Sequence, residues 1–559
     1  MASRYFFPKI LNSLHLPTFF LIIGFMVFWL ELYLIGNEPG KTTPLAWALF
    51  LSAAFFTVKK EYRSIKNRIL ESSRQIRQQT LLCKIMVFAG LVCTVFIFAC
   101  AFYAALLPPH LGQEYDALNY HITIPRQHLI LETFKHLGWS SADLFLLPVD
   151  FALAPFWLAT TLPNKIPQFF FALGLVLIAV SLTRKLGGSS FLSIFIVSFA
   201  IVGSHGFGIQ LGTAMLDLVI CYLALAALES FLSGSYTLFL IEFTFFFWSK
   251  PFIPLQMILI LILIWAAYVL VKRMGIKKVL LGFEAPNHPE VKVDSRSFKG
   301  LIMGFVVLSL LIAGPFIFKS LYYAGTPLFP FRPGLFLSEK DSAGSGFRSA
   351  LEDSSKIYMS VRTSYGYSRS PVDFLKHLWI IAVPESGVNN RYDYPVGLPY
   401  LLFLVPFAFF LKSHLAEKRF SLLGFFIVFY WLLWWMGSHQ TRFLYLPIFL
   451  MFIITVAHRE MNSKILLCIL VFSLSINALS VYRAHSSDFW RLKEEVLRPI
   501  DKEIVLFNKH YVDAERKDVV VWKSEDIAFA EFPAFVIKKN DAFVLYPKVP
   551  EALTGTIRP

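Results

Sequence analysis

Apolar runs close to 20 residues long recur from near the start of the chain almost to position 480. A run of this length crosses the hydrocarbon core of a bilayer as a helix, because a helix satisfies its own backbone hydrogen bonds within lipid. The composition agrees with this: 56% of the 559 residues are hydrophobic, only 16% are charged, and the mean hydropathy is +0.60. We therefore predict an all-α polytopic membrane protein.

Apolar length predicts about thirteen transmembrane helices. They cover residues 16–36, 43–58, 82–107, 167–183, 189–205, 213–231, 236–248, 252–271, 300–318, 396–411, 420–436, 443–458 and 464–481. The first run has no small-residue cleavage site after it, so we expect it to remain as a signal anchor. All five cysteines fall within or at the edge of these runs, which favours buried thiols over a metal site or disulfides.

Basic residues indicate the orientation, because Lys and Arg accumulate in cytoplasmic loops. Large basic clusters follow the runs at 43–58 and 252–271, and smaller ones stand at 184–185, 412–419 and 459–464. All of these fall on one side if the N-terminus is cytoplasmic, and an odd number of spans then places the C-terminus outside. The net charge of +15 is explained by this topology, so we expect no nucleic-acid partner.

Three long segments are predicted to lie outside, at 108–165, 319–395 and 482–559. The apolar stretch 144–162 in the first is broken by prolines and predicts helices lying along the membrane interface. The last segment predicts a small α/β domain. The expected domains are therefore 1–81, with two leading helices and a basic cytoplasmic loop, the transmembrane core 82–481, and the C-terminal domain 482–559.

The first external segment opens with a dense group of reactive side chains: Glu114, Asp116, Tyr120 and His121 directly follow the third run. A carboxylate at the edge of a low-dielectric region is well placed to act as a general base. Two other interpretations stay open. One is an ordinary solvated loop, and the other is a metal site that adds His128 to the two acids and His121.

Five stretches, in this order, resemble motifs of the GT-C membrane glycosyltransferases, with the protein mannosyltransferase and aminoarabinose transferase branch the closest. They are Asp116-Ala-Leu-Asn-Tyr120-His121-Ile-Thr-Ile-Pro125, Gly212-Thr-Ala-Met-Leu-Asp217-Leu, Phe247-Trp-Ser-Lys250-Pro, the segment from Gly314-Pro315 through Lys319-Ser320 to Gly325-Thr326-Pro327-Leu-Phe-Pro330, and Gln440-Thr-Arg442-Phe-Leu-Tyr-Leu-Pro447. The resemblance covers residues 82–481. Thr326 and Ser320 stand where the family has asparagines.

The resemblance implies a GT-C-like core that transfers a sugar from a polyprenyl-phosphate carrier to an acceptor hydroxyl on the non-cytoplasmic face, with inversion. It implies Asp116 as the catalytic base, with Glu114 as the second acid. Lys250 and Arg442 are candidate ligands of the lipid phosphate. The full set of substrate-binding candidates is Tyr120, His121, Asp217, Lys250, Arg391 and Arg442. No cofactor is implied, and a divalent metal ion is left open.

Each of these residues has a structural alternative. Asp116 and Asp217 suit helix N-caps, and Lys250 and Arg442 suit basic residues that snorkel to the interface. Two alternatives concern the whole protein: a polymerase or ligase of lipid-linked glycans, and a transporter or flippase, which predicts charges near mid-span and repeat symmetry. The expected partners are the lipid-linked donor, a lipid, glycan or protein acceptor, and the lipids of a bacterial inner membrane.

Overall fold

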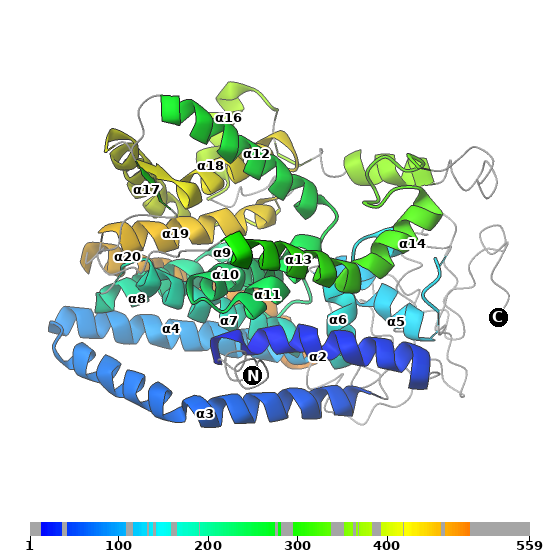
Figure 1. The fold of residues 1–559 in the computed structure, drawn as a ribbon. Coiled ribbons are helices and arrows are strands. Elements are labelled where there is room, and N and C mark those ends of the chain that lie inside the picture. Colours follow the sequence, from blue (N-terminus) through cyan, green and yellow to red (C-terminus); the bar gives the residue numbers. More distant parts are fainter. Residues whose placement is uncertain are drawn as a thin grey trace.

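The computed structural model describes residues 13–35, 42–107, 114, 116–130, 133–137, 141–157, 165–188, 190–273, 278–280, 295–336, 351–360, 365–366, 368–382, 393–417, 419–459 and 464–491. These residues form a helical bundle (Figure 1). The last helix, α20 (Lys464–Arg491), continues past the predicted domain boundary at 481. The rest of the predicted C-terminal domain lies outside the described residues.

Seven helices of the described chain are long and apolar enough to cross a membrane, or up to eight if one bent pair counts as a span. The seven are α2 (Leu16–Leu30), α4 (Leu81–Leu106), α7 (Ile166–Lys185), α12 (Phe252–Arg273), α17 (Leu398–Ala416), α19 (Tyr445–Arg459) and α20. The prediction of a polytopic helical membrane protein is therefore confirmed, whereas length and composition alone do not give thirteen spans.

The other predicted spans correspond to shorter, bent or less apolar helices. Three are apolar but have fewer than 18 residues: α8 (Phe191–Val202), α11 (Tyr236–Trp248) and α18 (Leu422–Met436). A fourth, α10 (Asp217–Leu232), begins with a charged residue. The bent pair consists of α13 (Ser295–Ile312) and α14 (Gly314–Ala324), whose axes differ by 58° at a break beside Pro315.

The basic cytoplasmic loop predicted after the second span is instead helical. Helix α3 runs without interruption through Thr43–Arg77, and its second half carries the basic residues. The physical reason is local: no Gly or Pro follows Pro44 within the helix, and Lys, Arg, Glu and Leu are strong helix formers. Figure 1 shows α3 and α4 running in opposite directions and joined by a short turn at one end of the bundle.

The described part of the apolar stretch predicted to lie along the interface, residues 144–157, is buried within the protein. It contains α6 (Pro148–Trp157), all of whose residues are buried. The helix packs against α2 at a close approach, since a Cβ added to Gly24 would lie 1.8 Å from the carbonyl oxygen of Ala152. Small residues permit such contacts between helices in a membrane. The burial of α6 differs from the lipid-facing surface expected of an interfacial helix, because the prolines on which the prediction rested do not reveal that the leading helix α2 covers this segment.

A buried polar cluster fixes the start of α2 to the rest of the bundle. His15 lies between two carboxylates, with Nδ1 2.7 Å from Glu242 Oε1 and Nε2 3.0 Å from Glu229 Oε2. Lys185, at the end of α7, also contacts Glu229 at 2.9 Å. Buried charges are stable only when they are paired, so this cluster specifies how the leading helix docks on α10 and α11.

Strands form only one small sheet in the described residues. β1 (Lys278–Leu280) pairs in parallel with β2 (Arg419–Ser421), with Lys278 opposite Arg419. The two strands belong to the two basic segments that follow α12 and α17. Their pairing places both segments at the same end of the bundle, as the orientation argument requires.

Candidate functional site

The candidate site begins with an ion pair at the start of α10. Asp217 is the first residue of this helix, and its Oδ1 lies 2.7 Å from Nζ of Lys250, which stands in the turn between α11 and α12. Gln210 Nε2 donates a hydrogen bond of 3.3 Å to the other oxygen, Oδ2. Both charged side chains are at least nine-tenths buried. The N-cap alternative for Asp217 is not met, because Leu216 occupies that position.

Arg442 enters the same site from η5 (Thr441–Leu444), the 3-10 helix directly before α19. Its guanidinium lies against Asp116, with one terminal nitrogen 2.9 Å from Oδ2, and its Nε is 3.9 Å from Asp217 Oδ2. The ring of Phe443 lies under both cations, 5.0 Å from Lys250 Nζ and 5.3 Å from the guanidinium carbon. Such cation–π contacts orient both charges inward, which differs from snorkelling toward the bilayer surface.

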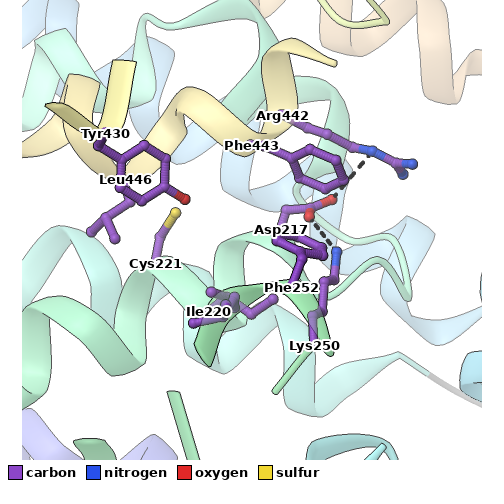
Figure 2. A pocket seen from close by; sticks show the side chains of 10 residues that line it. Asp217, Ile220, Cys221, Lys250, Phe252, Tyr430, Arg442, Phe443 and Leu446 are labelled. Atoms are coloured by element: carbon purple, nitrogen blue, oxygen red, sulfur yellow. Dashed lines mark hydrogen bonds and ion pairs between the residues drawn. The ribbon is translucent and has the colours of Figure 1, made fainter. Parts of the chain in front are cut away.

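Asp116 precedes the short π-helical turn η3 (Ala117–His121) and occupies its N-cap position. Its side chain makes no capping hydrogen bond there and turns to Arg442 instead. Four residues that the resemblance selected, from positions more than 300 apart at the extremes, are thus brought together: Asp116, Asp217, Lys250 and Arg442. Figure 2 shows Asp217 between the side chains of Lys250 and Arg442.

A third carboxylate, which the sequence analysis missed, completes the cluster. Asp393 precedes α17 in a left-handed conformation, with φ of 71°, and its Oδ2 lies 3.0 Å from Arg442 Nε. The Nε–H bond does not point at this oxygen, and both atoms are buried without a hydrogen-bond partner among the described residues. The neighbouring candidate Arg391 lies outside the described residues. The signal that could have revealed Asp393 is the need of a buried cation for balancing charge.

The two loop aspartates differ in proton affinity. Burial raises the pKa of Asp116, but the nearby Arg442, His121 and Lys250 outweigh it and hold the pKa below the usual range. Burial raises the pKa of Asp393 to about 6, against the opposing charge of Arg442. Among the described residues, three carboxylates of this cluster share two cations, Lys250 and Arg442. The pKa of Asp393 therefore lies nearer to neutral pH than that of Asp116.

A small pocket extends from these charges between α10, α12, α18 and α19. Asp217, Lys250 and Arg442 form its polar end, and its wall is mostly apolar (Figure 2). The wall residues are Ile220, Cys221, Phe252, Ile253, Tyr430, Phe443 and Leu446. The outward face of α12 is exposed along much of the helix, at Leu255, Ile258, Leu259, Ile262 and Trp265. Helix α12 thus contributes Phe252 and Ile253 to the apolar wall and exposes its other face.

The other first-loop candidates lie at different distances from the cluster. The Tyr120 ring packs against that of His121, with centroids 4.2 Å apart, and its charge environment includes Asp116 and Arg442. His121 Nδ1 is hydrogen-bonded to Asp150 of α6, while its Nε2 is buried without a partner among the described residues. Glu114 belongs to a separate buried ion pair, 2.8 Å from Lys165 at the start of α7.

A second buried cluster connects the segment between α4 and α7 to α14. Asp143 is paired with Lys319 and receives a hydrogen bond from His136, with 3.1 Å between Nδ1 and Oδ2. His128 Nε2 lies 2.5 Å from Asp143 Oδ1 and 2.8 Å from Lys319 Nζ. The group is almost fully buried and internally paired, so it fits a structural role. His128 is thereby held away from the metal set in which the sequence placed it.

The position of Asp217 depends on a glycine that begins the same motif. Gly212 has φ of +84°, and a Cβ there would lie 2.3 Å from the carbonyl oxygen of Ala101 in α4. We expect Gly212→Ala to destabilise the protein by more than about 2 kcal/mol, because it combines backbone strain with a clash. The measurement is thermal unfolding in detergent.

Gly234 provides the matched control for this substitution. It has φ of +67° but no atom within 4 Å of an added Cβ, so Gly234→Ala isolates the strain from the clash. An equal loss of stability in both variants would show that the contact with α4 does not matter.

Within the described residues, no group of three or more His, Cys, Asp or Glu side chains is arranged to hold a metal ion. No family model, curated protein or solved structure matches the chain. Chemically, the site offers two fixed cations beside an apolar pocket and two partly accessible carboxylates, with exposed side-chain fractions of 22% for Asp116 and 17% for Asp393. This combination suits an anionic lipid headgroup next to a group that loses a proton.

Proposed function

We propose that the protein is a membrane glycosyltransferase of the GT-C type. It transfers a sugar from a polyprenyl-phosphate donor to an acceptor hydroxyl on the non-cytoplasmic face, with inversion and with an aspartate as general base. The observation that carries the proposal is the convergence of Asp116, Asp217, Lys250 and Arg442. Four separate motifs of one resemblance supply these residues, and unrelated motifs have no reason to meet at one point.

The same proposal includes the membrane topology. Helix α3, the bent pair α13–α14 and the shorter helices α8, α10, α11 and α18 are taken as further passes, which gives about thirteen in all. Short or broken helices are tolerated where neighbouring helices satisfy the backbone. With a cytoplasmic N-terminus in a bacterial inner membrane, the ends of α4 and α11 and the start of α19 then lie on the outer face, where the charged cluster is found.

The pocket gives the proposed donor a binding mode. Lys250 and Arg442 bind the phosphate, and the apolar wall takes the first isoprene units of the carrier, which arrives through the bilayer beside α12. An ammonium has three N–H donors, so Lys250 holds Asp217 and a phosphate oxygen at the same time. Two cations at the bridging phosphate stabilise the charge that develops when the bond to the sugar breaks.

Replacement of Asp116 tests the proposal directly. Asp116→Asn removes the carboxylate closest to the Arg442 guanidinium, and we expect sugar transfer to fall at least about 100-fold. The measurement follows label moving from radiolabelled polyprenyl-phosphate hexoses and pentoses into acceptors of the membrane fraction. Asp353→Asn is the matched control, since Asp353 is 63% exposed and far from the cluster in the chain. Undiminished transfer by Asp116→Asn would remove Asp116 from the catalytic set.

A transporter is the second candidate, and one observation favours it. Glu242 lies midway along α11 and is fully buried, together with His15 and Glu229. Charges buried at mid-helix are typical of proteins that move ions or solutes. In the assay above, absence of transfer from every polyprenyl-phosphate sugar, together with solute flux in reconstituted vesicles, would favour the transporter over the transferase.

A further inference from the structure

Asp393 and Arg442 each have one buried polar atom that lies close to the other but makes no hydrogen bond to it. Asp393 Oδ2 is an acceptor and Arg442 Nε–H is a donor; the two atoms are 3.0 Å apart, and each is buried without a hydrogen-bond partner in the described part of the chain. Buried polar atoms left unpaired cost free energy, so such a pair is suited to a ligand that satisfies both. A hydroxyl group does so, because it accepts one hydrogen bond and donates another.

The remaining contacts of the cluster distinguish Asp393 from the other two aspartates. Asp217 is held by Lys250 and Gln210 and its side chain is only 3% exposed. Asp116 is held by a terminal nitrogen of Arg442 at 2.9 Å. Of the three, Asp393 alone has a buried oxygen that receives no hydrogen bond from the described residues, in a side chain that remains 17% exposed.

We propose that Asp393 is the catalytic base, and that it takes the proton of an acceptor hydroxyl whose oxygen is held by Nε–H of Arg442. This inference rests on the proposed function and moves the base from Asp116, which the sequence analysis selected, to Asp393. Asp116 then serves to position the guanidinium, so that the Nε–H bond is directed toward the hydroxyl oxygen.

The proposed step is balanced in atoms and charge. The acceptor O–H bond breaks and its proton passes to Asp393 Oδ2, while the oxygen electron pair forms a bond to the anomeric carbon of the sugar. The bond from this carbon to the phosphate oxygen breaks, and its electron pair leaves with the polyprenyl phosphate. Asp393 later releases the proton to water. Single displacement of this kind inverts the anomeric centre.

The charges around Asp393 support this role. The charged groups that face Asp393 are Arg442, Asp217, Asp116 and Lys250. Its charge also acts on the tyrosines at 365, 394 and 445. Burial raises the pKa of Asp393 to about 6, whereas Arg442 helps to hold the pKa of Asp116 below its usual range. A base works best when its pKa is near the working pH, which favours Asp393.

The test is the pH dependence of transfer by the full-length protein in membranes, measured with the same radiolabelled polyprenyl-phosphate sugars. Transfer by the wild type is expected to rise with pH through about 6, because Asp393 must be ionised to accept a proton. The rate of sugar transfer is expected to fall at least about 100-fold in Asp393→Asn, and the residual rate is expected to show no rise with pH. Asp393→Glu keeps a carboxylate, so it is expected to retain the rise at a reduced rate.

Asp116→Asn is the comparison that separates the two aspartates. It removes a negative charge that raises the pKa of Asp393, so its reduced activity is expected to keep the rise, displaced to lower pH. A rise that disappears in Asp116→Asn but persists in Asp393→Asn would overturn the assignment to Asp393 and leave the proposed function standing. Absence of transfer by the wild type from every donor would overturn both.

If Asp393→Asn does not fold, the variants Asp393→Glu and Asp116→Asn still distinguish which aspartate is the base. Loss of the pH-dependent rise in Asp116→Asn contradicts the proposal, and its displacement to lower pH supports it.

Discussion

Arg442→Ala is expected to abolish measurable sugar transfer and to destabilise the protein. The guanidinium lies within 4 Å of three carboxylates, and its removal leaves Asp116, Asp217 and Asp393 with Lys250 as the one remaining cation that the described residues supply to the cluster. Breaking a buried ion pair from one side costs about 3–5 kcal/mol, because the other charge remains buried. The variant also loses a positive charge that stabilises the transition state, and this loss lowers the transfer rate by at least about 100-fold.

Arg442→Lys separates these two effects. It retains the charge, so most of the stability should return, but an ammonium lacks the planar set of donors that contacts Asp116 and Asp393 from different nitrogens. Transfer should therefore stay low while the melting temperature in detergent recovers. Arg483→Lys is the control, since Arg483 is exposed on α20. Recovery of full transfer in Arg442→Lys would show that the site needs only a positive charge.

Lys319→Met is the second substitution with a large expected effect, this time on stability rather than on chemistry. Lys319 is the cation of the buried cluster with Asp143 and His128, and Met fills a similar volume without charge. Asp143 would remain as a buried anion, so we expect a loss of about 3–5 kcal/mol. The double variant Lys319→Met with Asp143→Asn should recover part of that loss, because it removes both charges.

The same cluster predicts a pH dependence with a definite sign. Burial raises the pKa of Asp143, but Lys319 and His128 outweigh this effect and hold the pKa well below its usual range. A carboxylate whose pKa is lowered by folding stabilises the fold above its unfolded pKa of about 4, and this stability is lost as the pH falls below that value. Melting temperature against pH should therefore fall less steeply in acid for the double variant than for the wild type.

A surface pair provides the control for Lys319. Lys356 and Asp353 are 3.0 Å apart but 74% and 63% exposed. Lys356→Met should leave the melting temperature unchanged, since solvent screens such pairs. A change equal to that of Lys319→Met would indicate that loss of charge, rather than burial of the unpaired partner, is responsible.

Hydropathy predicted the class of fold because the bilayer imposes it. Long apolar runs such as those of α4 and α20 can form little else. The predictions that differ from the structure concern how segments pack against one another, which the length of an apolar run does not indicate. The stretch that contains α6 was predicted to lie on the membrane, yet α2 covers it, and the contact depends on Gly24, a single small residue in another helix. The basic segment after position 58 was predicted as a loop, although its composition favours the helix observed.

The part of the candidate site that belongs to sequence motifs was predictable. Asp116, Asp217, Lys250 and Arg442 were each selected from the sequence, and the structure places them in contact. Asp393 was not selected, because it has no motif of its own and its importance arises only from the guanidinium beside it. Glu114 was paired with Asp116 for its nearness in sequence, whereas in space it pairs with Lys165.

The distribution of the site along the chain has a consequence for biogenesis. Asp217 meets its cation within 33 residues, so that pair can form while a single hairpin of helices enters the membrane. Asp116 must wait for Arg442, near the other end of the transmembrane part, before its charge is matched. Until then the insertion machinery or water must accommodate an unmatched carboxylate. Chains that stop before η5 are therefore expected to insert less stably than the full chain, because Asp116 lacks the guanidinium that contacts it in the folded protein.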